Sequence, residues 1–458
     1  MKHSSDDQSH SVLPKAPAGS CGPGWASLPA FHHPQAADRE SKDTDTCSSG
    51  LLACHGLSSG LLGGISAAVC GGPHSSGLLS SGILSSGVLC GEGLSSGLLG
   101  GIVHAPQSRV THRPLSVCHL GPCLYRGGSE QHLIDLARFL DPKRAVMREC
   151  LVTDPQKIDP CVVRSLPCPV RAVNANEIDA ALQQHDIVLH WGLELDQFAS
   201  VGSQRKSVNI YLAHGDSQWT QELLVRSAKH TDHVIAVSHK VVDGWKPKTP
   251  TTVIPNGIDT ARLATSRSRK DIRRELGFGC HDFVVGFVGR LSAEKRPELL
   301  IKAIAQLPPQ FKALIVGWGD MQGSLMKLAN DLIPNRYAFR FADSYLGDYY
   351  QAFDAFLLPS VFEGFGLVIL EAMFMGLPVL ATPVGVVPEA IESMISGIVI
   401  KPCPDDIAQK LSLLRANPDW SRGMGTAAQK WAHEFGYARR MADEYANLFE
   451  QLVRARHS

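Results

Sequence analysis

Two basic residues stand just after an apolar run, in the segment GFVGRLSAEKRPELL (286–300). The segment predicts a strand that ends at Val288, a glycine turn, and a helix that begins near Glu294. Arg290 and Lys295 would then lie at the carboxyl end of that strand, where a parallel sheet opens a crevice. A guanidinium can bond two oxygens and an ammonium is a compact charge, so the pair suits a diphosphate. The alternative is an exposed Arg and Lys at a helix start.

Two glutamates eight positions apart, Glu363 and Glu371, mark a second candidate site in the stretch 359–382. Gly364 and Gly366 precede a predicted helix, and glycines there let a ligand approach backbone N–H groups that favour anions. Glu371 falls on an otherwise apolar helix, where an unpaired carboxylate costs on the order of several kcal/mol. A ligand hydroxyl would be a suitable partner. A structural ion pair or cap is the alternative, which we consider the weaker interpretation.

The first half of the chain offers two further candidates at predicted strand ends. YRGGSE (125–130) places Gly127 and Gly128 in a turn between an apolar strand and a helix, which again favours an anion. His214 follows the apolar run NIYLA (209–213) and is expected at the same edge of the sheet. A lone histidine is more often structural, but its place at a strand end favours a functional role.

Two sets of strands and helices must position these residues. Apolar runs predict strands in the first half at 115–120, 145–152, 186–190, 208–213 and 233–238, the last ending at the cleft candidate Ser238. The second half predicts strands at 251–255, 283–289, 312–317, 337–342, 353–359, 378–382 and 397–400. Helical patterns include 129–140, with Ser129 as its N-cap, 292–306, 321–333, 367–375, 405–415 and 437–453. This α/β alternation predicts two Rossmann-like, doubly wound parallel-sheet lobes that face across a cleft and are joined by a Pro-rich linker at 245–252.

Residues 1–107 differ in composition from the rest of the chain. Of the 42 glycines, 18 lie in the first 105 residues, and variants of the pentad Ser-Ser-Gly-Leu-Leu recur there. A five-residue repeat matches neither the helical nor the strand period, so we expect a low-complexity, disordered Gly/Ser/Leu-rich tail. Membrane contact and a misassigned start are the alternatives. No run of about 18 consecutive apolar residues occurs, which argues against a spanning helix, and the N-terminus is a poor secretory signal.

The composition argues against several classes of protein. Lys plus Arg and Asp plus Glu both number 44, so the formal net charge is zero and a nucleic-acid partner is not expected. The 12 cysteines contain no CxxC pair, which indicates reduced thiols rather than a zinc site. The one Asp-x-Asp triplet lies in the tail, at residues 43–45, so we expect no metal in the cleft.

The motifs together resemble the retaining glycosyltransferases of family 4, which have the GT-B fold and belong to the glycogen synthase-like superfamily. Glu363 and Glu371 in EGFGLVILE match the E-x7-E signature of that family, and GRLSAEKRP lies upstream. IPNGID, VGWGD and the GGxE-like YRGGSE are similar to other motifs of the family. In TPVGVVPEAI, Val386 stands where a glycine is expected. The resemblance covers roughly residues 108–455.

The resemblance implies a role for each candidate residue. His214, Arg290, Lys295 and Glu363 would be catalytic, with His214 contacting the transferred sugar and the two cations stabilising the leaving diphosphate without a metal. Glu371 would bind the nucleotide ribose, and Glu363 the sugar hydroxyls. The leaving phosphate would deprotonate the acceptor, and the anomeric configuration would be retained. Donor binding would involve Gly127, Gly128, Arg290, Lys295, Glu363, Gly364, Phe365, Gly366, Leu367 and Glu371.

The same resemblance implies the organisation and the setting. We expect an N-terminal lobe on the acceptor side at 108–247, a C-terminal lobe on the donor side at 248–435, and a final helix at 436–458 that crosses back to the first lobe. The expected activity is hexose transfer from a UDP- or GDP-linked donor to a glycan or lipid-linked acceptor, with no further cofactor. We expect cytoplasmic polysaccharide biosynthesis and also consider a peripheral contact with the membrane. A non-catalytic nucleotide-binding GT-B protein and a GT-B sugar-nucleotide epimerase are the alternatives.

Overall fold

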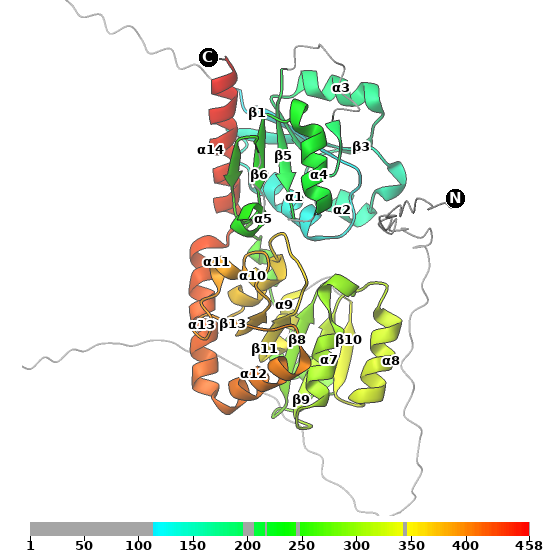
Figure 1. The fold of residues 1–458 in the computed structure, drawn as a ribbon, viewed down its shortest axis with the longest axis vertical. Helices are drawn as coiled ribbons and strands as arrows, with labels where there is room; N and C mark the ends of the chain where they lie inside the picture. Colours follow the sequence, from blue (N-terminus) through cyan, green and yellow to red (C-terminus); the bar gives the residue numbers. More distant parts are fainter. Residues whose placement is uncertain (1–112, 196–205, 216–217, 244–247, 342–345, 458) are drawn as a thin grey trace, which may run out of the picture. The chain divides into compact units, whose positions relative to one another are not determined.

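The computed structural model describes residues 113–457 except 196–205, 216–217, 244–247 and 342–345. The tail predicted for residues 1–107 lies outside the described residues, as does part of the predicted linker. The described chain forms two lobes, each built on a parallel sheet flanked by helices (Figure 1). The two Rossmann-like, doubly wound lobes expected from the alternating pattern are therefore confirmed.

The first lobe contains a seven-stranded sheet whose pairings are all parallel, in the order β3-β2-β1-β4-β5-β6-β7. Its central strands are completely buried, which is typical of a parallel sheet covered on both faces. The strands are β1 (Leu115–Gly121), β2 (Ala145–Val152), β3 (Val170–Ala172), β4 (Ile187–His190), β5 (Val208–Ala213), β6 (His233–Ala236) and β7 (Thr251–Val253).

The second lobe repeats the design with a six-stranded sheet in the order β10-β9-β8-β11-β12-β13. Its strands are β8 (Phe283–Val288), β9 (Phe311–Val316), β10 (Tyr337–Arg340), β11 (Ala355–Leu358), β12 (Val379–Ala381) and β13 (Ile398–Val399). Strand order reverses between β1 and β4 in the first lobe and between β8 and β11 in the second. Ligands of doubly wound sheets bind at such switch points, beyond the carboxyl ends of the strands.

Helices cover both sheets. The first lobe has α1 (Gly128–Phe139), α2 (Pro160–Ser165), α3 (Ala175–Gln184), α4 (Gln218–Ser227) and α5 (His239–Asp243). The second has α6 (Arg269–Glu275), α7 (Glu298–Ala305), α8 (Gln322–Leu332), α9 (Leu346–Ala352), α10 (Leu367–Phe374), α11 (Val387–Ala390), α12 (Pro404–Ala416) and α13 (Pro418–Phe435), and α14 (Ala438–His457) follows. Short 3-10 turns are η1 (Pro155–Lys157), η3 (Ala228–His230), η4 (Thr260–Leu263) and η5 (Ala293–Lys295). Among the described residues, no helix combines the length and the apolar composition that crossing a lipid bilayer requires.

The strand predicted at 251–255 is shorter and belongs to the other lobe. Thr251–Val253 forms β7, which pairs with β6 in the first sheet instead of beginning the second series. The prediction was wrong because a three-residue edge strand carries no sign of its partner, and long-range pairing decides which sheet it joins. The first sheet therefore extends past residue 247, where the sequence placed the lobe boundary.

The chain passes between the lobes at two adjacent places. Ile258 pairs with Tyr437 in an isolated parallel bridge, and the Ile258 N–H donates to Gly436 O at 2.8 Å. After the second passage, α14 runs along the first lobe, whereas α13 runs along the second (Figure 1). Arg144 of the first lobe contacts Glu450 of α14 at 2.8 Å, and the apolar face of α14 joins the core of that lobe. The C-terminal helix is thus part of the first lobe's packing.

Candidate functional site

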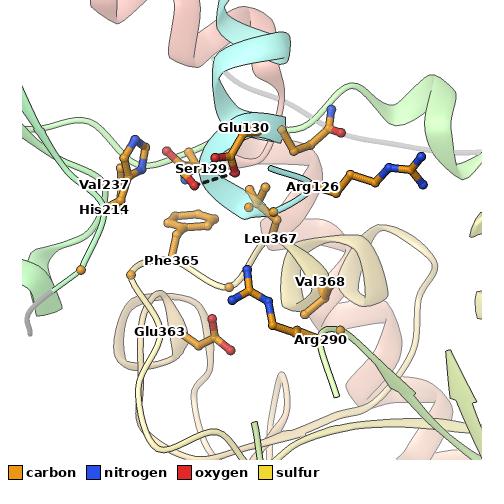
Figure 2. Close-up of a pocket in the computed structure, with 18 of the residues that line it drawn as sticks. Arg126, Ser129, Glu130, His214, Val237, Arg290, Glu363, Phe365, Leu367 and Val368 are labelled. Atoms are coloured by element: carbon orange, nitrogen blue, oxygen red, sulfur yellow. Dashed lines mark hydrogen bonds between the residues drawn. The ribbon is translucent and has the colours of Figure 1, made fainter. Parts of the chain in front are cut away.

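A cavity of about 1020 Å³ is lined by residues of both lobes. Its walls include the loops after β1, β4 and β5 of the first lobe and after β8 and β11 of the second. In Figure 2, Arg290 extends from the second lobe toward Ser129 and Glu130 at the start of α1, and His214 lies on the first-lobe wall. Both switch points open into this cavity, which brings the predicted residues together. Those that line it are Gly127, Gly128, His214, Arg290, Lys295, Glu363, Gly364, Phe365, Gly366, Leu367 and Glu371.

The two basic residues that the sequence predicted for the site differ in their partners. Lys295 Nζ forms an ion pair with Glu363 Oε2 at 2.7 Å, and the two side chains are 21% and 10% exposed. The other oxygen of Glu363 accepts a hydrogen bond from Ser360 Oγ at 2.8 Å. Arg290 is exposed and makes no side-chain hydrogen bond or ion pair with any residue that the structure describes. One cation is therefore held by a carboxylate, while the other is open to an anion.

The helix predicted to begin near Glu294 is split in two. Ala293–Lys295 forms the 3-10 turn η5, Arg296 adopts a left-handed conformation with φ 50°, and α7 begins at Glu298. The cause is Pro297, because the residue before a proline is disfavoured in the α region. Lys295 consequently ends a short turn at the cavity and is not part of a longer helix.

The loop between β11 and α10 brings the lobes into direct contact. A Cβ atom on Gly364 would lie 1.7 Å from His214 O, so only glycine fits against the backbone of the first lobe there. Ser238 Oγ, just after β6, donates to Gly364 O at 2.7 Å. Gly366 caps α10 with φ 90°, a conformation that favours glycine. From the sequence we expected both glycines to let a ligand approach the backbone. At Gly364, however, the group that lies closest is the backbone of the first lobe.

Glu371 is completely buried and already has protein partners. One of its oxygens forms an ion pair with Arg262 of η4, and the other accepts a hydrogen bond from the Tyr350 hydroxyl at 2.7 Å. Burial raises the pKa of Glu371, and Arg262 and Tyr350 oppose that rise. The structural ion pair, which we considered the weaker interpretation, is therefore present, because a cation distant in sequence compensates the carboxylate. Glu371 and Arg262 both line the cavity.

Arg262 also connects the two lobes. Its Nη1 atom lies 3.8 Å from Asp135 Oδ2 on α1, and the Asp135 side chain is completely buried. Gln131 donates to the other oxygen of Asp135 at 2.8 Å. Burial raises the pKa of Asp135 to about 6, against the opposing charge of Arg262. A single guanidinium thus lies between two buried carboxylates, one from each lobe.

The turn after β1 presents a carboxylate that the sequence reasoning missed. α1 begins at Gly128 with Gly127 as its N-cap, so Ser129, the predicted cap, lies inside the helix. Ser129 Oγ instead donates to Glu130 Oε2 at 2.8 Å. Burial raises the pKa of Glu130, while Ser129 and Arg290 oppose the rise. Glu130 is the last residue of the GGxE-like motif, and that motif could have identified it as a site residue.

His214 follows β5 and has aromatic neighbours at the cavity wall. Burial lowers the pKa of His214 to about 4, so its ring is neutral at pH 7. The rings of Trp191 and His132 lie edge-on to it, with centroids 6.0 Å and 5.1 Å away. Both were missed from the sequence. Trp191 directly follows β4 at the switch point, so its place at a strand end could have identified it as a cavity residue. His132 lies within α1, and no such signal was available for it.

Outside the cavity, the described residues include one group with donors suited to a metal. Cys118, Glu149 and His185 have donor atoms within 4.8 Å of one another, and none of the three lines the cavity. His185 Nε2 lies 2.9 Å from one oxygen of Glu149, and Arg171 Nε lies 2.9 Å from the other. Protein groups alone therefore satisfy this carboxylate.

Comparison with known proteins defines the class of the second lobe. The profile of the family described as Glycosyl transferases group 1 matches residues 268–431. The matched stretch holds Arg290, Lys295, Glu363 and Glu371. The second lobe is thus similar to the domain that this family profile describes.

The chain is also similar to curated proteins that are named as glycosyltransferases. The chain is 32% identical over 274 residues to a D-inositol 3-phosphate glycosyltransferase of Corynebacterium jeikeium, which covers 54% of this chain and 65% of that protein. It is 31% identical over 221 residues to a protein of the same name from Nocardiopsis dassonvillei, with coverage of 45% and 51%. The aligned regions span between about half and two thirds of the length of these relatives.

Solved structures show the same architecture. Anabaena HepE, determined in complex with UDP-glucose, has a TM-score of 0.64 and 24% identity, over 74% of this chain and 100% of that one. Sucrose-phosphate synthase from Thermosynechococcus elongatus has a TM-score of 0.61 and 20% identity, again over 74% and 100%. These similarities establish the fold, and the two lobes have the GT-B arrangement expected from the motifs.

Proposed function

We propose that the protein is a retaining glycosyltransferase of family 4 that moves a hexose-type sugar from a nucleotide-sugar donor to an acceptor hydroxyl. The observation that carries the proposal is the open cation Arg290 beside the paired Lys295 and Glu363, in a cavity lined by both lobes. The match to the glycosyl transferases group 1 profile supports the same activity.

The charge of the leaving group accounts for the two cations. Breaking the bond between the sugar and a diphosphate develops negative charge, which preorganised positive groups stabilise. Arg290 can bond two phosphate oxygens, and Lys295 supplies a point charge. The N-terminus of α10, which begins at Leu367 on the cavity wall, adds the positive end of a helix dipole. We propose that these groups do the work that other transferases assign to a divalent metal.

Glu363 and His214 would hold the sugar from opposite walls. Lys295 and Ser360 fix the orientation of the Glu363 carboxylate, whose remaining lone pairs can accept hydrogen bonds from sugar hydroxyls. The neutral ring of His214 can donate one hydrogen bond from its protonated nitrogen and accept one at the other nitrogen. In this proposal the leaving phosphate takes the acceptor proton, so attack occurs on the face of departure and the configuration is retained.

Glu371 would bind the ribose of the nucleotide without giving up its protein partners. A carboxylate offers about four lone-pair sites, and Arg262 and Tyr350 use one on each oxygen. Ribose hydroxyls could take the remaining sites. The ion pair would then orient the carboxylate in advance, which lowers the entropy lost on binding.

The donor and the acceptor are proposed by class. The HepE complex with UDP-glucose supports a UDP-linked donor, with a GDP-linked donor as the alternative. The relatives' names support a phosphorylated polyol as acceptor, in addition to the glycan or lipid-linked acceptor that the motifs imply. We place the reaction in cytoplasmic polysaccharide biosynthesis, with peripheral contact at the membrane face.

A donor screen tests this proposal. UDP- and GDP-sugars are first ranked by thermal shift, since only a bound ligand raises apparent stability by mass action. Release of UDP or GDP is then measured with and without a panel of acceptors. We expect Arg290→Ala to lower kcat/KM by about 100- to 1000-fold. Arg274→Ala is the matched control, because Arg274 is 72% exposed and pairs with the nearby Asp271.

Three outcomes would contradict the proposal. Binding of a donor without turnover would favour a non-catalytic protein. Nucleotide release at the same rate with and without acceptor would favour an epimerase. Equal losses in the two arginine variants would show that Arg290 has no special role.

A further inference from the structure

A tyrosine of the C-terminal helix reaches the histidines behind the cavity wall. Tyr445 of α14 and His132 of α1 are completely buried, and the Tyr445 hydroxyl lies 3.2 Å from His132 Nε2. The two rings are 5.6 Å apart, and the His132 ring then lies edge-on to His214. A continuous line of contacts therefore runs from α14 through α1 to a side chain of the cavity.

The contact determines which His132 nitrogen carries the hydrogen. Burial and the neighbouring His214 and His119 lower the pKa of His132, so the ring is neutral and one nitrogen is protonated. Burial raises the pKa of Tyr445, which keeps its hydroxyl hydrogen in place. Among the described residues, His132 Nε2 is the one hydrogen-bond partner of that hydroxyl, and a buried donor is costly to leave unpaired. Tyr445 therefore donates to Nε2, and His132 carries its hydrogen on Nδ1.

The hydrogen on Nδ1 has an acceptor available at the cavity wall. Asn256 is buried, lines the cavity, and is the neighbour besides Tyr445 that acts on the His132 ring by hydrogen bonding. Neither His132 Nδ1 nor Asn256 Oδ1 has a hydrogen-bond partner among the described residues, so a bond between them would satisfy both buried atoms. Small movements on ligand binding would complete this bond.

We propose that Tyr445 and His132 are positioning residues for the cavity side chains His214 and Asn256. Tyr445 fixes the tautomer of His132, and His132 then presents an N–H to Asn256 and makes a T-shaped ring contact with His214. The assignment rests on the proposed function in so far as His214 and Asn256 act in sugar transfer. The assignment also gives α14 a role beyond packing, because the Tyr445 hydroxyl on this helix orients groups in the cavity.

The test compares two Tyr-to-Phe variants of the full chain. Tyr445→Phe removes only the hydroxyl and keeps the ring. We expect it to lower kcat by roughly two- to tenfold, the equivalent of one buried hydrogen bond, with the donor KM unchanged. Tyr437→Phe is the matched control, because the Tyr437 hydroxyl contacts His433 Nδ1 at 2.6 Å at the surface and neither residue lines the main cavity. That variant should keep the wild-type kcat.

A second measurement separates this assignment from the proposed function. The ring nitrogens of His132 and His214 are followed by NMR in histidine-labelled protein. Tyr445→Phe should shift both residues, whereas Tyr437→Phe should shift only His433. Ring shifts without a fall in kcat, unchanged shifts, or an equal fall in both variants would each overturn the assignment. If the wild type transfers no sugar, the proposed function fails and the NMR result alone decides whether Tyr445 sets the state of His132.

Discussion

The two lobes differ in the charged groups that they present to the cavity. The second lobe presents full charges: Arg290 is open, and Lys295 is held by Glu363 at 2.7 Å. In the first lobe, burial lowers the pKa of His214 to about 4 and raises that of Glu130, while Arg126 pairs with Asp159 at 3.1 Å. In the proposed function, the anionic leaving group would therefore bind to the cations of the second lobe, and His214 of the first lobe would contact the sugar as a neutral ring.

The halves meet at Arg262. Its guanidinium lies between Glu371 of the second lobe and Asp135 of the first, and both carboxylates are completely buried. Each carboxylate has a raised pKa because burial outweighs the attraction of the shared cation. Substitutions at Arg262, and then in each lobe, test whether the two lobes differ in charge as described.

The largest expected effect comes from removing the shared cation. Arg262→Met leaves two buried carboxylates with hydrogen-bond donors but without a cation, and loss of one partner of a buried ion pair typically costs about 3–5 kcal/mol. We therefore expect the free energy of unfolding at neutral pH to fall by about that amount, as measured by urea denaturation.

The double variant Arg262→Met/Glu371→Gln controls for side-chain packing. Neutralising Glu371 removes one of the uncompensated charges, so much of the lost stability should return. If Arg262→Met alone costs less than about 1 kcal/mol, as exposed ion pairs do, the junction does not hold the lobes in the way described.

The next effect concerns the charged half. Lys295→Ala removes a cation from the proposed diphosphate site, and we expect kcat/KM to fall by about 100- to 1000-fold, in the range of a lost transition-state donor. Because Lys295 and Glu363 are 2.7 Å apart, Lys295→Ala and Glu363→Gln should not be additive in steady-state kinetics. Strict additivity would mean that the pair does not act as a unit.

Most of the architecture followed from local sequence patterns. Apolar runs with a glycine at their ends predicted β8 and β9 almost to the residue, because a parallel strand that is buried on both faces is apolar along its whole length. Most of the candidate residues met in one cavity because they had been chosen in loops that follow strands, and the topology of a doubly wound sheet brings those loops together. Glu371, which had been chosen on a helix, lines the same cavity. The short strands were harder, as β7 shows.

The partners of the site residues could not be predicted in the same way. Arg262 and Glu371 are 109 positions apart, and Tyr445 and His132 are 313 apart. No periodicity in the chain connects such residues, because tertiary packing alone brings them together. The sequence could therefore show that Glu371 needed a partner but not that a protein cation supplies it.

A pH titration tests the first-lobe side of the junction. The pKa of Asp135 is about 6 in the folded protein, against about 3.9 for an unfolded aspartate. The unfolded state therefore releases this proton first, so the contribution of Asp135 to stability is greatest below about pH 4 and is lost as the pH rises through about 6. Relative to Asp135→Asn, the wild type should lose about 3 kcal/mol of unfolding free energy between about pH 3 and about pH 7.5, roughly 2 kcal/mol of it between pH 4 and pH 6. Parallel curves for the two proteins would show that Asp135 ionises normally.

The smallest effect should come from the neutral half. His214→Gln keeps a side chain that can form hydrogen bonds but removes the ring, so we expect kcat to fall by only roughly two- to tenfold, the equivalent of one neutral hydrogen bond. Because the pKa of His214 is about 4, the ring is uncharged between about pH 5.5 and 8. The pH dependence of kcat should therefore have the same shape in the wild type and the variant. A limb near pH 6 to 7 that appears only in the wild type would show that His214 ionises in that range in the substrate complex and is not neutral throughout. A loss as large as that of Lys295→Ala would mean that the first lobe also stabilises charge, and the contrast between the two halves would no longer hold.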